Sequence, residues 1–273
     1  MTPSDAVDSP PPETRPPAPG LRVPAPVRAI ARGRPLRLAW HSVVGGLTYE
    51  LGSGSERRFV KWAPRSAPVD LAGEAARMEW AIDFTPVPRV LDQGYDDDGS
   101  WIVMAALAGE SAVTERWRGD PARAVVAIGS GLRAFHDALP VEGCPFSWSV
   151  EKRLARMHGR VRRPEQWREV HRSLALAEAL DLAAQPPPID RPVVCHGDAC
   201  APNTLIDGAG GCSGHVDLGS LGVADRWADL AVATWSTEWN YGPGWSEPLL
   251  AAYGIRQDPE RTHYYRLLWD LEP

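Results

Sequence analysis

The sequence has few cysteines and lacks the long apolar runs of membrane proteins. The four cysteines in this chain of 273 residues form no CxxC pair, and Cys195 and Cys200 flank the key motif, which argues against a disulfide there and favours reduced thiols in the cytoplasm. No apolar run approaches the roughly 20 residues that a membrane-spanning helix needs. The N-terminus also lacks the apolar core of a signal peptide. We therefore expect a cytoplasmic protein with no membrane partner.

The sequence also lacks an excess of positive charge. It contains 29 Lys and Arg against 35 Asp and Glu, which gives a formal net charge of −6. Proteins that bind nucleic acids are more often basic, so we expect no nucleic-acid partner. Mild acidity suits a cationic ligand, but it is also common among cytosolic proteins and does not identify a ligand by itself.

The first part of the chain divides into a tail and a strand-rich lobe. Residues 1–36 are rich in Pro and show no apolar period, so we predict a disordered tail. Residues 37–106 contain short strand-like runs and one helix pattern over residues 70–81, where Asp70 can cap the helix. We predict that residues 37–106 form a small N-terminal lobe.

The rest of the chain, residues 107–273, has a helical character. Asp120-Pro121 is typical of a helix start, and apolar residues then recur at alternating spacings of three and four as far as Leu139. A further helix is predicted over residues 165–184. The expected fold class is α+β, with a small sheet-containing lobe followed by a larger, mainly helical lobe.

Three polar side chains in two short loops give the most specific chemical signal. Asp198 follows an apolar, strand-like run, Asn203 lies five residues later, and Asp217 follows a second such run. A carboxylate at position 198 can accept the proton of an attacking hydroxyl. The oxygens of Asn203 and Asp217 suit Mg²⁺, which takes few protein ligands. Together they predict a kinase that transfers a phosphoryl group from a nucleotide to a small molecule.

A lysine and a glutamate in the first lobe extend this interpretation. Lys61 lies in a predicted strand, where a solvated side chain is the ordinary outcome. Glu74 lies on the apolar face of the predicted helix at residues 70–81, and a carboxylate buried there needs a partner. We predict a pair between Lys61 and Glu74 that can hold the ammonium against nucleotide phosphates.

Two further residues are predicted to support the loop that carries Asp198. His196 could be a metal ligand or a base, but we favour a buried histidine that supports the loop through hydrogen bonds. Asp229 lies on an apolar helix stripe. We interpret it as an anchor for the loop backbone and not as a reactant.

These motifs resemble those of the aminoglycoside O-phosphotransferases, the 3′ and 3″ kinases of the protein-kinase-like fold. The resemblance covers residues 40–273 and rests chiefly on VVCHGDACAPNTLID and GHVDLGSLGVADRWADLAVAT, with support from FVKWAP, LAGEAARMEW and YYRLLWDLEP. It implies a two-lobed fold, ATP and Mg²⁺ as cofactors, and a cationic aminoglycoside as the substrate. Phosphorylation at the 3′ or the 3″ hydroxyl, with resulting antibiotic resistance, is the implied function.

The resemblance also implies a role for each motif residue. Lys61 would contact the α- and β-phosphates and Glu74 would pair with it. Asp198 would be the catalytic base, while Asn203 and Asp217 would bind Mg²⁺.

Further residues are implied in nucleotide and acceptor binding. The backbone from Ala105 to Leu107 would contact adenine at the junction of the lobes. The carboxylates of Glu238, Asp270 and Glu272 would bind the polycationic substrate. We expect the enzyme to be a monomer.

Three alternatives remain open at this level. The acceptor could be another small hydroxylated metabolite, because nucleotide chemistry and acceptor recognition use different residues. The chain could be a nucleotide-binding regulator without turnover. A metal-dependent hydrolase that uses His196, Asp198, His215 and Asp217 is a weaker alternative, because zinc sites usually offer more His or Cys in a tighter pattern.

Overall fold

The computed structural model describes residues 22–42, 44–157 and 159–272 of the chain. These residues form two compact units. The smaller unit contains the described residues up to Ala108 together with residues 215–219, and the larger unit contains residues 109–214 and 220–272. The boundary predicted from the sequence did not assign residues 215–219 to the small unit, because so short a segment carries no compositional signal.

The small unit is built on a five-stranded antiparallel sheet in the order β1-β2-β3-β5-β4. Its elements are α1 (Ala25–Ala31), β1 (Leu36–His41), β2 (Leu47–Leu51), β3 (Arg58–Pro64), α2 (Leu71–Ala81), β4 (Val90–Tyr95) and β5 (Gly99–Ala105). The predicted cap of α2 is confirmed, because the Asp70 carboxylate accepts the Gly73 N–H at 2.8 Å.

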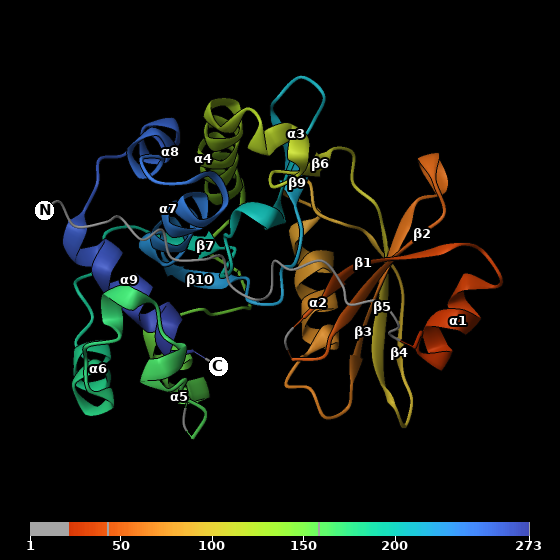
Figure 1. The fold of residues 1–273 in the computed structure, drawn as a ribbon, viewed down its shortest axis with the longest axis horizontal. Helices are drawn as coiled ribbons and strands as arrows, with labels where there is room; N and C mark the ends of the chain where they lie inside the picture. Colours follow the sequence, from red (N-terminus) through yellow and green to blue (C-terminus); the bar gives the residue numbers. More distant parts are fainter. Residues whose placement is uncertain (1–21, 43, 158, 273) are drawn as a thin grey trace, which may run out of the picture. The chain divides into compact units, whose positions relative to one another are not determined.

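The two helices of the small unit lie on opposite faces of its sheet (Figure 1). Successive residues of a strand point to opposite faces, so Val60 and Lys61 of β3 face different helices. Val60 packs in a cluster with Val27 and Ala31 of α1, while Lys61 contacts Glu74 of α2. The sheet is therefore covered on both sides.

Helix α1 corrects one prediction from the sequence. Residues 1–21 of the predicted tail lie outside the described residues, but residues 25–31 are helical and not disordered. Val27 and Ala31 are buried against the sheet, and this burial stabilises a helix of only seven residues. Two apolar residues in a Pro-rich context were too weak a periodic signal to reveal it.

The large unit is mainly helical. Its helices are α3 (Glu115–Arg118), α4 (Pro121–Ala138), α5 (Val150–Met157), α6 (Leu176–Ala183), α7 (Trp227–Tyr241), α8 (Ser246–Tyr253) and α9 (Pro259–Leu271). Its strands are β6 (Glu110–Ser111), β7 (Pro192–Cys195), β8 (Thr204–Ile206) and β10 (Gly222–Asp225), while β9 (Cys212–His215) ends at the boundary between the units. The helix predicted over residues 165–184 is wrong in its first half, where only short 3₁₀ turns precede α6.

Helix α4 provides the centre of the large unit. The residues at the predicted spacing (Val125, Ile128, Leu132, Phe135 and Leu139) are all at most 3% exposed. Burial of each such side chain contributes about 1.5–3 kcal/mol relative to exposure. Helix α8 packs closely on α4, and a Cβ at Gly129 would overlap the Leu249 carbonyl oxygen.

A short antiparallel ribbon of β7 and β10 positions the loop predicted to be catalytic. Cys195 pairs with Gly222, and Val193 pairs with Ala224. Both strands are short and largely buried, so the chain leaves β7 at a defined point and enters the loop at His196.

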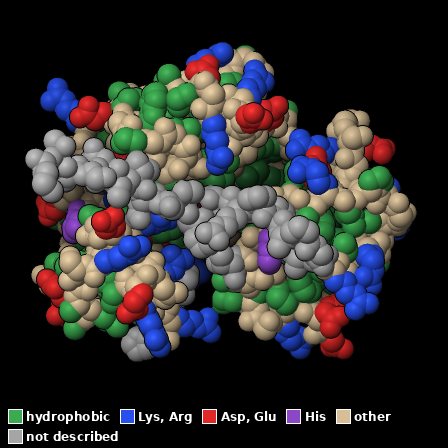
Figure 2. Space-filling view, viewed as in Figure 1, with side chains coloured by type: hydrophobic (Ala, Val, Ile, Leu, Met, Phe, Trp, Pro, Cys, Tyr) green, Lys and Arg blue, Asp and Glu red, His purple; other side chains and the backbone are tan. Residues whose placement is uncertain are grey.

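The described ranges contain no helix that is both long enough and apolar enough to cross a membrane. On the face drawn in Figure 2, Lys and Arg side chains lie among Asp and Glu side chains. This mixture agrees with the near balance of 29 basic and 35 acidic residues in the sequence.

Candidate active site

In the small unit, Lys61 and Glu74 form the predicted pair. The Lys61 Nζ donates to both carboxylate oxygens of Glu74, at 2.9 and 2.7 Å. Strand β3 supplies the lysine and α2 supplies the glutamate, which is only 2% exposed. A buried carboxylate is costly unless it is paired, so this contact stabilises the packing of α2 on the sheet.

Lys61 also contacts the loop residue Asp217. Its Nζ donates to Asp217 Oδ1 at 2.7 Å. Burial by itself would lower the pKa of Lys61, but the negative charges of Asp217 and Glu74 outweigh burial and raise the pKa above its usual value. Lys61 is therefore a permanently charged ammonium between two carboxylates.

Asp217 has an unusual backbone conformation. Its φ of 66° lies in the left-handed region, which costs a residue with a Cβ about 1–2 kcal/mol. Its side chain is 46% exposed, in contrast to the buried Glu74. The loop after β9 thus presents a carboxylate that is held at one oxygen by Lys61 and is accessible to solvent.

The predicted adenine contact lies at the end of the same sheet. Ala105 closes β5, and its N–H donates to the Arg89 carbonyl oxygen at 2.9 Å. The next N–H, that of Ala106, donates to the Arg57 carbonyl oxygen at 3.1 Å. The backbone is therefore held at Ala105 and Ala106, at the end of β5, shortly before the chain leaves the small unit.

In the large unit, Asp229 anchors the loop after β7, as predicted. Its carboxylate accepts the N–H of His196 at 2.6 Å and the N–H of Gly197 at 2.8 Å. Burial by itself would raise the pKa of Asp229, but the hydrogen bond and charge of His136, the charge of His196 and the Gly197 N–H hold it below its usual value. Asp229 is fully buried, so it acts on the loop as a fixed anionic acceptor.

His196 is fully buried, as predicted for a supporting residue. Its Nδ1 accepts the Asp198 N–H at 3.3 Å. Gly197 has a φ of 82°, and a Cβ there would overlap the Ser220 backbone. Only glycine fits this turn without displacing a neighbour.

Asp198 and Asn203 lie together at the end of this loop. The Asn203 Nδ2 donates to the Asp198 carbonyl oxygen at 2.9 Å and to its Oδ2 at 3.0 Å. With the amide nitrogen assigned to these bonds, the Asn203 Oδ1 is the atom that can act as an acceptor or a metal ligand. Both side chains are partly exposed. The loop therefore presents a carboxylate and an amide in a fixed relation.

The three carboxylates predicted to bind the acceptor have different environments. Glu238 is partly exposed, accepts the Ser246 hydroxyl at 2.6 Å and lies 3.7 Å from Arg266. Asp270 is 1% exposed and accepts bonds from the Arg168 N–H and from His171 Nδ1. Its role as a substrate contact does not agree with this burial.

Glu272 is also engaged within the protein. It accepts two bonds from the Arg153 guanidinium, at 2.8 and 2.9 Å. Arg153 is only 1% exposed and needs this carboxylate, because an unpaired buried charge would be strongly destabilising. Glu272 is therefore an internal partner of Arg153, with 17% of its side chain exposed.

Glu238 lines a cavity of about 360 Å³ in the large unit. The other walls include His171, Trp235, His263 and Arg266. Ser236 follows Trp235 in α7, and its hydroxyl oxygen accepts the Ala201 N–H at 2.9 Å. Ser236 therefore contacts the loop that carries Asp198 and Asn203. Two residues that line the cavity, Trp235 and Glu238, thus lie within one turn of α7 from Ser236, which supports this loop.

The predicted alternative of a metal hydrolase finds no matching cluster. In the parts of the chain that the structure describes, three potential metal donors come together only at His136, Cys195 and Asp229. Burial raises the pKa of the Cys195 thiol well above its usual value, which disfavours a thiolate ligand. The hydrogen bonds of His136 and Asp229 account for this cluster without a metal.

Sequence reasoning missed the residues around Asp229. His136 lies beside Phe135 on the buried side of α4 and bonds to both Asp229 and Tyr253. A polar residue inside an apolar helix face was the available signal. That signal does not identify the hydrogen-bond partners of His136, because Tyr253 is 117 residues away in the chain.

The fold and the two groups of polar residues define a class of protein. A five-stranded antiparallel sheet carries a Lys–Glu pair, and a mainly helical unit presents Asp198 and Asn203 on an anchored loop. This combination is that of a protein-kinase-like phosphotransferase.

Comparison with known proteins agrees with this class. The model of the phosphotransferase enzyme family matches residues 41–265. An aminoglycoside 3′-phosphotransferase of Streptomyces fradiae is 37% identical over 254 residues, which cover 84% of this chain and 93% of the relative. The chain therefore belongs to the phosphotransferase enzyme family, and it is an enzyme of the kinase type. The resemblance inferred from its motifs is confirmed.

Solved structures support the same assignment. The crystal structure of an aminoglycoside-3′-phosphotransferase of type VIII superposes with a TM-score of 0.77 at 31% identity, covering 89% of this chain and 96% of the other. An aminoglycoside phosphotransferase of the 3″ type from Streptomyces rimosus, in complex with ADP and streptomycin, gives a TM-score of 0.70 at 28% identity. That alignment covers 89% of this chain and 94% of the other. The predicted kinase-like fold is thus confirmed over most of the chain.

Proposed function

We propose that this protein transfers the γ-phosphoryl group of ATP to a 3′ or 3″ hydroxyl of an aminoglycoside antibiotic and thereby confers resistance. The observation that carries the proposal is the fixed pair of Asp198 and Asn203 on the loop held by Asp229. The similarity to 3′ and 3″ aminoglycoside phosphotransferases supports the choice of acceptor. The reaction belongs in the cytoplasm, where ATP is available.

In the proposed mechanism, Asp198 is the catalytic base. Its carboxylate accepts the proton of the acceptor hydroxyl as the hydroxyl oxygen bonds to the γ-phosphorus. The bond between that phosphorus and the bridging oxygen of ADP breaks, so the products are the phosphorylated antibiotic, ADP and one proton. The Asn203 amide holds the carboxylate in one orientation through its bond to Oδ2. Such positioning reduces the entropic part of the barrier.

Lys61 is proposed to hold the nucleotide. Its ammonium is kept charged by Asp217 and Glu74 and can bind the α- and β-phosphates. The Leu107 N–H and the carbonyl groups of the Ala105–Leu107 backbone are proposed to hydrogen-bond adenine, since the N–H groups of Ala105 and Ala106 already donate within the small unit. The donors fit ATP: a cation for the phosphates and backbone groups for the base.

The residues proposed for Mg²⁺ are Asn203 and Asp217. One offers an amide oxygen and the other a half-exposed carboxylate, and hard oxygen ligands of this kind suit Mg²⁺. When bound, the ion would neutralise charge on the phosphates during transfer. Asp217 would have to exchange part of its contact with Lys61 for the metal.

For the acceptor, we assign Glu238 and the cavity beside it. Its carboxylate can accept a hydrogen bond from an ammonium group, and it lines the cavity together with Trp235 and Arg266. Asp270 and Glu272 are proposed to shape this region through His171 and Arg153 instead of contacting substrate. A monomer suffices for all of these roles, with neither a nucleic acid nor a membrane as a partner.

Mass spectrometry of a reaction with ATP and Mg²⁺ tests the proposal. We expect added phosphate on at least one member of a panel containing kanamycin, neomycin and streptomycin, and no such product with Asp198→Asn. A ³¹P–¹H correlation spectrum of the product would then show whether the phosphate is on the 3′ or the 3″ oxygen. An enzyme that phosphorylates none of them but accepts another hydroxylated metabolite would replace the proposed substrate.

A further inference from the structure

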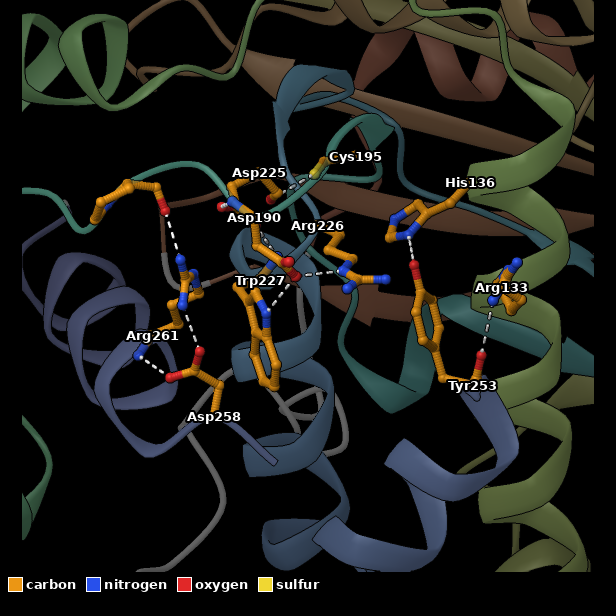
Figure 3. Close-up of polar contacts among 11 residues, drawn as sticks. Arg133, His136, Asp190, Cys195, Asp225, Arg226, Trp227, Tyr253, Asp258 and Arg261 are labelled. Carbon is orange, nitrogen blue, oxygen red and sulfur yellow. Dashed lines mark hydrogen bonds and ion pairs between the residues drawn. The ribbon is translucent and has the colours of Figure 1, made fainter. Parts of the chain in front are cut away.

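A buried chain of hydrogen bonds connects α8 to the loop that carries Asp198. The Tyr253 hydroxyl lies 2.8 Å from His136 Nδ1, and His136 Nε2 lies 2.9 Å from Asp229 Oδ2. Figure 3 shows the first of these contacts, with the imidazole of His136 on α4 directed at the phenol of Tyr253. Tyr253 is 1% exposed, His136 is 3% exposed and Asp229 is fully buried.

The ionised state of Asp229 fixes the direction of its hydrogen bond with His136. Asp229 is an ionised acceptor, because His136 and the loop amides keep its pKa low against the effect of burial. His136 Nε2 must then carry the proton that points to Asp229. Burial raises the pKa of Tyr253 to about 12, so the phenol keeps its proton, and its oxygen atom is the hydrogen-bond partner of His136 Nδ1. Both ring nitrogens of His136 are therefore engaged, one by Asp229 and the other by Tyr253.

This chain ends on the same carboxylate oxygen that holds the loop. Asp229 Oδ2 accepts both His136 Nε2 and the His196 N–H, while Oδ1 accepts the Gly197 N–H. Rotation of the carboxylate would therefore weaken the contacts that set the loop backbone just before Asp198. His136 limits that rotation, and Tyr253 limits rotation of His136.

We propose that His136 and Tyr253 are positioning residues for phosphoryl transfer, which orient Asp229 and through it the backbone that presents Asp198. Testing this role by measuring enzyme activity rests on the function proposed above. Neither residue contacts the reacting groups in this scheme. Their effect is on the rate of transfer within the bound complex, because a small displacement of a catalytic group can reduce a rate by about 100-fold.

Because Tyr253 lies in α8, the packing of this helix also helps to position His136 and Asp229. Helix α8 packs on α4 at the close approach of Gly129 to Leu249, so the distance between the phenol and the imidazole is fixed by the two helix backbones. Arg133 of α4 reinforces this arrangement, since its guanidinium lies over the Tyr253 ring, 5.7 Å from the centroid. The hydroxyl is thus held in place without a bond to any residue of the loop.

The substitution Tyr253→Phe removes one hydroxyl and keeps the ring. We expect kcat to fall by about 3- to 10-fold, with the KM for ATP within about twofold of the wild-type value, because the loop and not the nucleotide contact is changed. The backbone amide of Gly197, observed by NMR with ¹⁵N-glycine labelling, should change its chemical shift. Tyr264→Phe is a matched control: it loses a buried bond of 2.7 Å to the Ala183 carbonyl oxygen, which has no connection to the loop.

An unchanged kcat together with an unchanged Gly197 amide in Tyr253→Phe would overturn the proposal. Equal losses of kcat in Tyr253→Phe and Tyr264→Phe would also overturn it, because they would trace the effect to general stability. If the wild-type enzyme phosphorylates no aminoglycoside, the proposed function fails separately, and the NMR comparison still decides whether the hydroxyl orients the loop.

Substitution of His136 gives the second arm. His136→Gln keeps an N–H donor near the position of Nε2, whereas His136→Leu removes it at similar size. We expect His136→Leu to lower kcat by about 10- to 100-fold and His136→Gln to recover most of that loss. Equal activity in the two variants, at equal melting temperature, would overturn the role of the bond to Asp229.

Discussion

The Lys61 ammonium donates to both carboxylate oxygens of Glu74, and this pair joins β3 to α2. The same ammonium reaches Asp217 at 2.7 Å. Lys61 is therefore shared between a buried structural partner and a half-exposed loop carboxylate. The shared position explains why a single strand lysine can affect both the stability of the small unit and the proposed nucleotide site.

Lys61→Met is expected to abolish most activity and to destabilise the protein. Loss of the phosphate contact should reduce kcat/KM for ATP by about 100-fold or more. The uncompensated Glu74 should cost about 3–5 kcal/mol in the free energy of unfolding. The double variant Lys61→Met, Glu74→Gln separates the two effects. It should recover much of the stability, measured by urea unfolding, but none of the activity, and recovery of both would contradict the assigned role.

Asp198→Asn is expected to remove turnover while leaving ATP binding intact. The amide cannot accept the acceptor proton, and loss of a positioned base costs about 10²- to 10⁴-fold in rate. The side chain keeps an oxygen that can accept the Asn203 amide, so the loop should keep its shape. Calorimetric titration with ATP and a turnover assay would check the two statements. A variant with near-normal kcat would exclude Asp198 as the base.

Asp217→Asn is expected to raise the Mg²⁺ requirement. The amide provides a neutral oxygen in place of a carboxylate. Half-maximal activity should therefore require a Mg²⁺ concentration that is higher by about tenfold or more. A titration of activity against Mg²⁺ at saturating ATP measures this. Glu238→Gln serves as the control, because it should change the KM for the acceptor and not the metal requirement. An unchanged Mg²⁺ titration for Asp217→Asn would remove this residue from the proposed ligands.

Gly197→Ala is expected to damage the loop through steric overlap. Both Gly197 and Gly143 have positive φ, 82° and 83°, but only a Cβ at residue 197 would overlap the Ser220 backbone. Gly143→Ala should therefore cost only the left-handed conformation, about 1–2 kcal/mol. Gly197→Ala should lower the melting temperature further and abolish activity. Equal melting temperatures for the two variants would show that the loop can move away from Ser220.

The pH dependence of stability should contain a contribution from Asp229. Its pKa in the folded protein lies below the reference value of 3.8. A depressed pKa means that the ionised group stabilises the fold fully above the unfolded-state value and that this contribution is lost as the pH falls toward the lower folded-state value. Asp229→Asn should flatten the acid part of a plot of unfolding free energy against pH. An equally steep acid limb in the variant would assign it to other carboxylates.

Much of the fold could be predicted from local patterns in the sequence. The helix of residues 121–138 follows from its cap and its apolar spacing, and α2 follows from Asp70 in the same way. The pair of Lys61 and Glu74 was also predictable, because a carboxylate on a buried face requires a nearby cation. Local signals failed where burial came from distant residues, as for α1, which depends on the sheet beneath it.

The sequence by itself determined the residue types at the site: Asp198, Asn203 and Asp217 in loops that follow strand-like runs, and Asp229 on a buried stripe. Their chemistry and spacing are local properties, so the class of reaction could be inferred without coordinates. Only the tertiary structure decided which carboxylates are engaged by the protein itself. The family resemblance implied Asp270 and Glu272 as acceptor ligands, but they form hydrogen bonds with His171 and Arg153, respectively, which lie about 100 residues or more away in the chain. Such pairings depend on how the helices pack, and a local sequence pattern does not indicate which distant residues come into contact.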